Sequence, residues 1–411
     1  MHPGFLQIDD FDYPLPEGRI AQFPLENRDN SKLLIYDQGK IEQDIFFNIS
    51  QHLPGESLMV FNETRVVHAR LVFRKPTGSR VELFCLEPLA PFRDHQRAFV
   101  QTTQSEWLCL VGNSKRWKSG ALEMTIESGK RPVRLLAERI ATQSDGTARI
   151  RLSWDPPDLT FSQILELAGN IPLPPYIRRV PVRNDELTYQ TIYARQEGSV
   201  AAPTAGLHFT PSVFGSLKER KIDTLNLILH VGAGTFKPVS SGSLEQHQMH
   251  SEQVILPLES LEKLRNSSQK HLIAVGTTTT RLLESLYWHG VKVIKGLSNP
   301  LVMDVRQWDP YDLPVSDGIS REASLDAILE GCKKNSRDTV TGKTSLMIAP
   351  GYRFRYPDIL VTNFHQPKST LLLLIAAFIG DDWKKTYDYA LASGFRFLSY
   401  GDSCLFFRKT Q

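Results

Sequence analysis

From Thr210 onward, the sequence alternates between apolar strands, polar loops and helices, and this alternation limits the possible fold more than any other feature. Thr210 and Pro211 predict the start of a helix that runs to about residue 221, and the strand IDTLNLILH is predicted at 222–230. The apolar strands HLIAVG (271–276) and DILVTNF (358–364) are each followed by a polar loop and then by a helix, at 281–290 and 371–378. Such βαβ units place parallel strands in one sheet. We therefore expect an α/β fold whose main domain has largely parallel strands.

Residues 72–152 show a different pattern of apolar and turn residues. Short apolar runs such as VELFCLE, EWLCLVG and ARIRLSW recur every ten to twelve residues, separated by turn residues. This pattern is typical of a small antiparallel barrel or sandwich. We expect an inserted β-barrel domain at 72–152 and a main catalytic domain made of 1–71 and 153–411. Within the main domain, the charged and weakly periodic segment 298–345 is interpreted as an elaboration.

Composition excludes several classes of protein. The 411 residues are 41% hydrophobic and 23% charged, with a net charge of +3, which is ordinary for a globular protein that is not a membrane protein. The longest apolar run, Leu371–Ile379, is about half the length of a membrane span, and the first residues do not resemble a signal peptide. The four cysteines are scattered, which favours buried thiols in a reducing cytoplasm over a zinc site or disulfides.

Two stretches leave alternatives open at the residue level. FNETRV places Asn62 and Arg65 inside an apolar run, which indicates either a buried polar network or a ligand site. The turn Lys115–Lys118 sets basic residues around Trp117, which suits a contact with nucleic acid but is also typical of a solvated loop.

The stretch GSVAAPTAGLHFT (Gly198–Thr210) is rich in small residues and ends in His208 and Phe209. Small residues let a backbone approach another group closely. The stretch is therefore either a tight connection between packed elements or the wall of a site.

Polar residues also follow the predicted strands. They form three groups: His230 with Gly232 and Gly234, Thr277–Thr280 with Arg281, and Asn363 with His365 and Lys368; HQMHSE adds His250 and Glu252. Ligands in open α/β folds bind at the carboxyl ends of strands, so several such loops at one edge favour a site.

The loop HVGAGTFKPV suggests a nucleotide-binding fingerprint, but its details exclude one. Lys237 occupies the position of the third glycine, and Pro238 prevents a helix from starting there. The histidines show no spacing typical of metal ligands, so no metal site is predicted, and acid–base chemistry fits them better. Arg281 and Glu284, at i and i+3, could be an ordinary ion pair or an oriented pair in a site.

Many of these motifs together resemble one family, the S-adenosylmethionine:tRNA ribosyltransferase-isomerases of queuosine biosynthesis. The resemblance rests on motifs that run in family order along nearly the whole chain: FNETRV, IPLPPYI, YQTIYA, GSVAAPTAGLHF, LHVGAGTFKPV, HQMHSE, AVGTTTTRLLES, TNFHQPKSTLLLL and FRFLSYGDS. Two details depart from the pattern: Thr279 and Thr280 replace residues that are often Ser and Val, and 298–345 is longer than in short members.

The resemblance implies transfer and isomerisation of the ribosyl part of S-adenosylmethionine onto 7-aminomethyl-7-deazaguanine at the wobble position of a tRNA. The products would be epoxyqueuosine-tRNA, adenine and methionine. S-adenosylmethionine would be a consumed substrate and no separate cofactor is expected. The partners would be the modified-base tRNA and S-adenosylmethionine, and we expect a cytoplasmic monomer that does not contact a membrane.

The chemistry of this reaction suggests roles for the residue types. The sulfonium acidifies the neighbouring ribose carbon, so a base can remove a proton while adenine leaves. His208, His230, His365, Glu252 and Arg281 are the catalytic candidates. Carboxylates and aromatic faces could balance the sulfonium charge, and Arg65, Arg281 and Lys368 could hold a carboxylate or phosphate. The candidates for substrate binding are Asn62, Arg65, Thr204, Gly206, Phe209, Gly232, Gly234, Thr235, Thr277, Thr278, Glu284, Asn363, Lys368, Tyr400 and Asp402.

Two other functions compete with this one. A methyltransferase acting on RNA would form S-adenosylhomocysteine instead of adenine and methionine. A non-catalytic tRNA-binding protein would use the basic turn of the insert, but it would not explain the polar loops at the strand ends.

Overall fold

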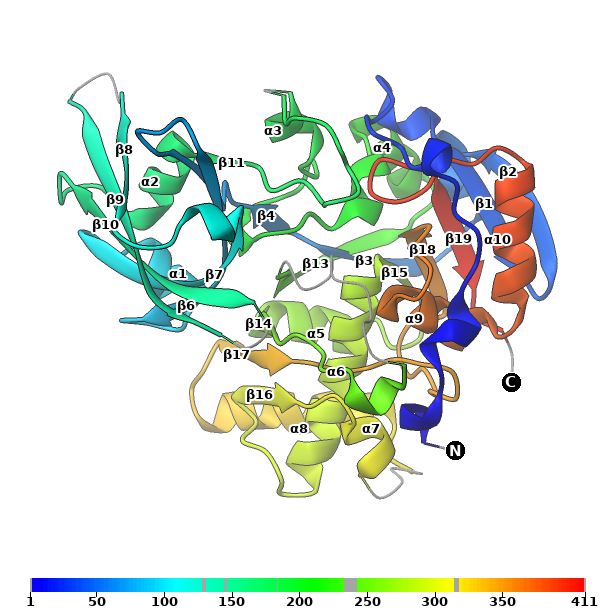
Figure 1. Ribbon diagram of the computed structural model, residues 1–411. Coiled ribbons are helices and arrows are strands. Elements are labelled where there is room, and N and C mark those ends of the chain that lie inside the picture. Colours follow the sequence, from blue (N-terminus) through cyan, green and yellow to red (C-terminus); the bar gives the residue numbers. More distant parts are fainter. Residues whose placement is uncertain are drawn as a thin grey trace.

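A computed structural model describes residues 2–127, 131–143, 146–182, 184–232, 242–313 and 318–409 (Figure 1). Its main element is a ten-stranded mixed sheet with the order β16-β17-β14-β13-β3-β15-β18-β19-β1-β2. The central strands β13, β3, β15 and β18 are parallel to one another, as the alternation of strands and helices predicts. The strands span Val302–Val305 (β16), Thr339–Thr344 (β17), Glu252–Pro257 (β14), Asp223–His230 (β13), Ser57–Asn62 (β3), His271–Val275 (β15), Ile359–Asn363 (β18), Ser403–Phe407 (β19), Lys32–Asp37 (β1) and Lys40–Ile45 (β2).

Both faces of this sheet are covered, which explains why its central strands are continuously apolar. Every residue of β3 is buried, and successive side chains enter two different cores. Leu58 and Val60 join the core that contains α6 and α9, whereas Met59 and Phe61 join the core beneath α4. The helices around the sheet are α4 (Pro211–Glu219), α5 (Leu258–Asn266), α6 (Thr277–Ile294), α8 (Arg321–Lys334), α9 (Thr370–Ile379) and α10 (Asp382–Ala392).

The inserted segment forms a second, seven-stranded sheet, which lies to the left of the main body in Figure 1. All its pairings are antiparallel, in the order β11-β5-β6-β7-β10-β9-β8. Its elements are β5 (Arg70–Arg74), β6 (Arg80–Ala90), α1 (His95–Phe99), β7 (Gln104–Gly112), β8 (Leu122–Ile126), β9 (Val133–Thr142), β10 (Thr147–Asp155), α2 (Phe161–Ala168) and β11 (Gly169–Asn170).

The expected barrel is corrected to an open, curled sheet. Within the described ranges, no strand pairing joins β8 to β5 or β11, although β5 and β8 approach each other. Helix α2 packs on the concave side, where Phe161 contacts Trp107 and Trp154. These large side chains pack over β7 and β10, which are central strands of the sheet. The domain boundaries at residues 72 and 152 stay a prediction.

Local signals in the sequence account for several helix ends. Thr210 accepts a hydrogen bond from Val213 N and Pro211 opens α4, as predicted. Helix α2 begins with a capping box, in which Thr160 accepts a hydrogen bond from Gln163 N. Thr277–Thr280, by contrast, were expected in a loop after β15 but form the first turn of α6.

The segment 298–345 is more regular than its composition indicates. It contributes β16, the short helix α7 (Asp309–Asp312), α8 and β17, which together extend one edge of the main sheet. Helix α8 packs closely on α6 because Gly290 has no side chain: a Cβ there would lie 2.1 Å from the carbonyl oxygen of Ser324.

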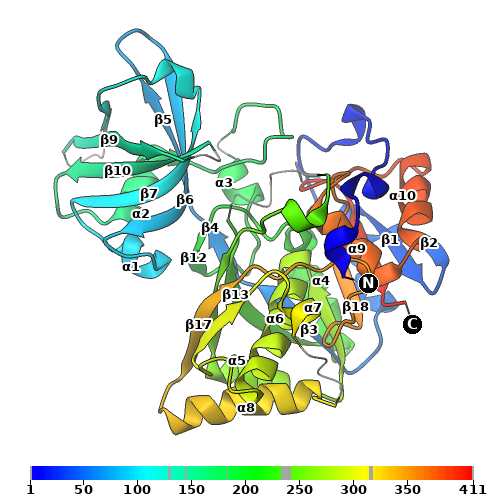
Figure 2. The same cartoon turned by 60° about the horizontal axis from the view of Figure 1, so that its bottom comes forward.

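The two sheets are joined by short paired segments. β4 (Thr64–Val66) pairs with β12 (Gln196–Ser199) in a two-stranded parallel sheet between them, and α3 (Asp185–Thr188) lies on the connection that follows β11 (Figure 2). No helix in the described ranges combines the length and apolar content that crossing a membrane requires.

Candidate functional site

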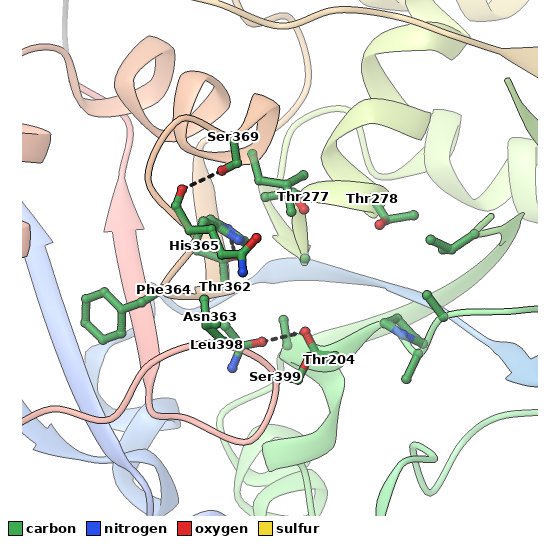
Figure 3. A pocket seen from close by; sticks show the side chains of 18 of the residues that line it. Thr204, Thr277, Thr278, Thr362, Asn363, Phe364, His365, Ser369, Leu398 and Ser399 are labelled. Carbon is green, nitrogen blue, oxygen red and sulfur yellow. Dashed lines mark hydrogen bonds between the residues drawn. The ribbon is translucent and has the colours of Figure 1, made fainter. Parts of the chain in front are cut away.

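A first pocket lies at the carboxyl ends of β15 and β18, where the parallel strands of an open sheet place their ligands. It encloses about 770 Å³ of empty space, part of it open to solvent. Figure 3 shows its polar lining, which comes from the first turn of α6, from the last residues of β18 and from the loop that follows β18. These lining residues are Thr277, Thr278, Thr362, Asn363 and His365.

The opposite wall of the first pocket is the small-residue stretch that follows Gly198. Ala201, Ala202 and Ala205 line it with little bulk, and Thr204 adds a hydroxyl. The Thr204 hydroxyl donates to the Asn363 side-chain oxygen at 2.8 Å and so joins the two walls. Of the two alternatives for this stretch, the placement of these residues favours the wall of a site.

His365 lies in the first pocket as a neutral group. Its Nε2 atom is 3.0 Å from the Thr362 hydroxyl. Burial lowers the pKa of His365 to about 3, because an imidazolium would lose its hydration there. At neutral pH the ring is therefore uncharged, so it can act as a base but not as an imidazolium acid.

His208 lies behind the first pocket and does not line it. Its Nδ1 is 2.8 Å from the Ser31 hydroxyl, and its Nε2 accepts a hydrogen bond from the Asn363 amide at 3.1 Å. Burial is the main cause that lowers the pKa of His208 to about 4, and the positive charges of Arg396 and Arg28 act in the same direction. A neutral His208 therefore fixes which way the Asn363 carboxamide points.

A second, larger pocket lies between the inserted sheet and the edge of the main sheet. It encloses about 1350 Å³, also partly open to solvent. The inserted sheet contributes residues 86–89, Arg93 and His95, and the main sheet contributes residues from β14, β16 and β17. Val231 lines both pockets, so they meet on either side of this residue.

His230, at the end of β13, lines the second pocket with an unpaired nitrogen. Its Nδ1 is 2.9 Å from the Thr64 hydroxyl, whereas its buried Nε2 has no hydrogen-bond partner among the described residues. The ring lies against Gly198, where a Cβ would come within 2.4 Å of it. Burial lowers the pKa of His230 to about 3. The combination is a neutral imidazole whose buried Nε2 has no hydrogen-bond partner among the described residues.

Neither pocket is lined by Glu252, Arg281 or Glu284. Each of these residues has a buried partner elsewhere in the main domain. Glu252 and Arg281 form a buried ion pair at 2.8 Å between β14 and α6. Glu284 accepts hydrogen bonds from the Tyr352 hydroxyl and from the backbone N–H groups of Arg355 and Tyr356, so it is not the partner of Arg281. Burial raises the pKa of both carboxyl groups.

Three further candidates are buried in structural contacts. The Asn62 amide bridges β3 to the backbone of Leu229, with bonds of 2.9 and 3.1 Å. Gly206 packs under the Tyr193 hydroxyl, which a Cβ would approach to 1.9 Å. Phe209 is fully buried and packs edge-on against Phe61.

The remaining candidates lie at the surface or behind the first pocket. Lys368 pairs with Asp9 and Asp12 of the N-terminal segment, and Arg65 is half exposed, 3.8 Å from Glu197. The Tyr400 hydroxyl donates to Asp185, and Asp402 pairs with Arg396. Gly232 lines the second pocket, while Gly234 and Thr235 lie outside the described residues.

Several lining residues are absent from the sequence-based candidates. Tyr176 and Tyr189 line the first pocket, and both belong to motifs, PPYI and YQTIYA, that could have indicated them. His95, Gln253 and Lys343 line the second pocket. His95 and Lys343 come from the inserted sheet and from the late segment, so no local pattern connects them to the other site residues.

The described residues contain no group of three His, Cys, Asp or Glu side chains placed to hold a metal ion. All four cysteines are buried and free. The polar side chains that line the two pockets are hydroxyls, amides, imidazoles and a few charged groups.

Comparisons with known proteins identify what this chain is similar to. A family model described as "Queuosine biosynthesis protein" matches residues 8–406. The S-adenosylmethionine:tRNA ribosyltransferase-isomerase of Acaryochloris marina is 38% identical over 96% of this chain and 92% of its own length. The enzyme of the same name from Halothermothrix orenii is 36% identical over 97% and 99%. A crystal structure of S-adenosylmethionine tRNA ribosyltransferase from Thermotoga maritima is 28% identical, covers 97% of this chain and 99% of that one, and has a TM-score of 0.45.

Proposed function

The chain belongs to the S-adenosylmethionine:tRNA ribosyltransferase-isomerase family of queuosine biosynthesis, and on this premise we propose where its reaction takes place. It is a transferase and isomerase that acts on the ribosyl part of S-adenosylmethionine and on tRNA. The acceptor is 7-aminomethyl-7-deazaguanine at the wobble position, and the products are epoxyqueuosine-tRNA, adenine and methionine. S-adenosylmethionine is consumed as a substrate, and the proposal includes no further cofactor.

The reaction takes place where the two pockets meet at Val231. Two substrates must bind side by side, and the protein offers two adjoining pockets, one with small residues and hydroxyls and the other with a free imidazole nitrogen. Within the first pocket, Thr204, Thr277, Thr278 and Asn363 are the binding groups. Gly232 and His230 belong to the second pocket.

His230 is the general base in this proposal. The Thr64 hydroxyl donates toward the Gln196 carbonyl at 3.5 Å, so it accepts from Nδ1–H of His230 and leaves Nε2 with a free lone pair. A base must take the proton from the ribose carbon next to the sulfonium while the bond to adenine breaks. His365, whose Nε2 already has the Thr362 hydroxyl as a partner, is the alternative. The unpaired Nε2 of His230 is the observation that carries the assignment.

His208, Arg281 and Glu252 act indirectly. His208 positions Asn363, and the Arg281–Glu252 pair holds β14 against α6 beside the first pocket. Lys368, Arg65, Tyr400, Asp402, Asn62, Glu284, Gly206 and Phe209 support the site through the contacts described above rather than by touching substrate.

Release of adenine tests the proposal. The protein is incubated with S-adenosylmethionine and with tRNA that carries the modified base, and free adenine is measured by mass spectrometry. His230→Gln is expected to lower kcat by about a hundredfold or more, with a small change in KM for S-adenosylmethionine. His271→Gln, an exposed histidine at the start of β15, is the matched control and should keep the wild-type rate.

Two outcomes of this assay would count against the proposal in different ways. A His230→Gln variant with normal kcat would remove His230 as the base. S-adenosylhomocysteine in place of adenine would replace the function itself with methyl transfer.

The remaining properties follow from this function as proposals. We place the protein in the cytoplasm with its tRNA substrate, as a monomer made of a catalytic part (1–71 and 153–411) and an inserted part (72–152). Sedimentation of the purified protein measures the oligomeric state directly.

A further inference from the structure

One end of the inserted sheet carries a group of cations that we call the basic tip: Arg74, Lys75, Arg80, Lys115, Arg116 and Lys118. Arg74 to Arg80 are the ends and connection of the hairpin β5–β6, and the other three follow β7. Arg74, Arg80, Lys115, Arg116 and Lys118 are exposed. The Lys75 ammonium donates to the Arg116 carbonyl at 3.0 Å, so the hairpin and the turn lie side by side, at the top of the inserted sheet in Figure 2.

Within the described residues, most cations of the basic tip lack the carboxylate partners that several other arginines of this sheet have. Elsewhere on the sheet, Arg134 pairs with Glu123, and Arg149 and Arg151 share Glu106. In the basic tip, Arg80 alone reaches a carboxylate within the described residues, at 3.8 Å from Glu82, which also pairs with Arg70 at 2.7 Å. The positive charge is thus left unneutralised at one end of the sheet.

Trp117 holds the turn of the basic tip in place. The expectation of an exposed aromatic in this turn is wrong, because 1% of the surface of Trp117 is accessible and its indole N–H donates to the Gly120 carbonyl at 2.8 Å. The Arg139 guanidinium also stacks over the Trp117 ring, with the guanidinium carbon 4.6 Å from the ring centroid. With Trp117 anchored in the core, the flanking lysines and Arg116 are directed to solvent in a fixed turn.

The basic tip is too far from the pockets to contact a small substrate bound there. Arg80 is the first residue of β6. The residues Leu86–Leu89, in the second half of the same strand, line the second pocket. At about 3.3 Å per residue, this strand separates the tip from the pocket by roughly 20–30 Å. A ligand that reaches both places must be long and negatively charged.

We propose that the basic tip binds the phosphate backbone of the tRNA substrate at a distance from the modified nucleotide. The proposal rests on the tRNA substrate of the proposed function. Unpaired lysines and arginines release counterions from a polyanion, so this contact adds affinity without reading sequence. It fixes where the tRNA body lies relative to the two pockets.

The test compares tRNA binding by wild type and by the triple variant Lys115→Glu/Arg116→Glu/Lys118→Glu. The dissociation constant should rise at least about tenfold at low salt, and the slope of log K against log salt should fall by about two to three, because up to three phosphate contacts are lost. Adenine release at saturating tRNA should keep the wild-type kcat, with an increased KM for tRNA and an unchanged KM for S-adenosylmethionine.

The matched control reverses three exposed cations elsewhere: Lys218→Glu/Arg220→Glu/Lys221→Glu. These residues lie just before β13 begins, at the edge of the sheet opposite to the first pocket, and the change in net charge is the same. Equal losses in both variants would reduce the effect to overall charge and overturn the proposal, as would unchanged binding in the tip variant. The single variant Lys115→Glu repeats the test if the triple variant folds poorly. Absence of adenine release from wild type would instead reject the proposed function.

Discussion

At the scale of single residues, the proposed chemistry uses neutral histidines that are held by specific partners. His208, His230 and His365 are all buried, and burial lowers the pKa of each. None of them is an imidazolium at pH 7, so none can supply a proton to adenine in that form. They differ in their hydrogen bonds: both ring nitrogens of His208 have a partner, whereas Nε2 of His230 has none among the described residues.

The contact between His208 and Asn363 predicts the effect of Asn363→Asp. A carboxylate 3.1 Å from Nε2 would stabilise the imidazolium, so the pKa of His208 should rise above its value of about 4. An NMR titration of the His208 ring measures this shift. Thr204→Val removes the hydrogen-bond donor to the Asn363 side-chain oxygen and is expected to leave the pKa of His208 unchanged. If Asn363→Asp leaves the pKa of His208 unchanged, the side chains of residue 363 and His208 do not interact.

At the scale of elements, the approach of α8 to α6 depends on one missing side chain. Gly290→Ala should destabilise the protein by about 2 kcal/mol or more, since its Cβ would lie 2.1 Å from the backbone of Ser324. Gly215→Ala is the matched control, because Gly215 is also inside a helix but has nothing within 4 Å of the added carbon. It should stabilise α4 by about 0.5–1 kcal/mol. Urea unfolding of both variants measures the difference, and two changes of the same sign would contradict the prediction.

The sequence predicts elements well where the signal is local. Strands β13, β15 and β18 and their helices follow from apolar runs and caps such as Thr210. The four threonines after β15 show the limit: their polarity suggests a loop, but packing against β15 and β18 draws them into α6, where Thr279 bonds to the Val275 carbonyl.

The site was predictable only in part, for a related physical reason. Residues at strand ends, such as Asn363 and His365, can be found because parallel strands end at one edge. The burial of Glu252 with Arg281, and the place of His95 beside His230, depend on contacts between segments far apart in the chain. No local pattern carries that information.

At the scale of the whole molecule, the buried histidines make stability depend on pH. The unfolded chain binds protons to these histidines below about pH 6.5, and the native protein does not until its lowered pKa values are reached, so stability should fall as the pH falls. For His208 alone, the shift from 6.5 to about 4 corresponds to about 3 kcal/mol at pH 4.

Urea midpoints between pH 7 and pH 4 measure this dependence. His208→Gln removes one of the titrating groups, so its stability should change less over this range than that of wild type, whatever its stability at pH 7. Parallel curves for the two proteins would mean that His208 is accessible to protons in the native state.

The two points where the chain enters and leaves the inserted sheet are neighbours, since Leu71 of β5 pairs with Gly169 of β11. A segment whose ends meet can be gained, lost or exchanged in one genetic event without changing the order of the strands around it. The main sheet and the inserted sheet can therefore have separate evolutionary histories. A lineage could alter the proposed contact with the body of the tRNA by replacing this one segment, while the residues at the strand ends of the main sheet remain untouched.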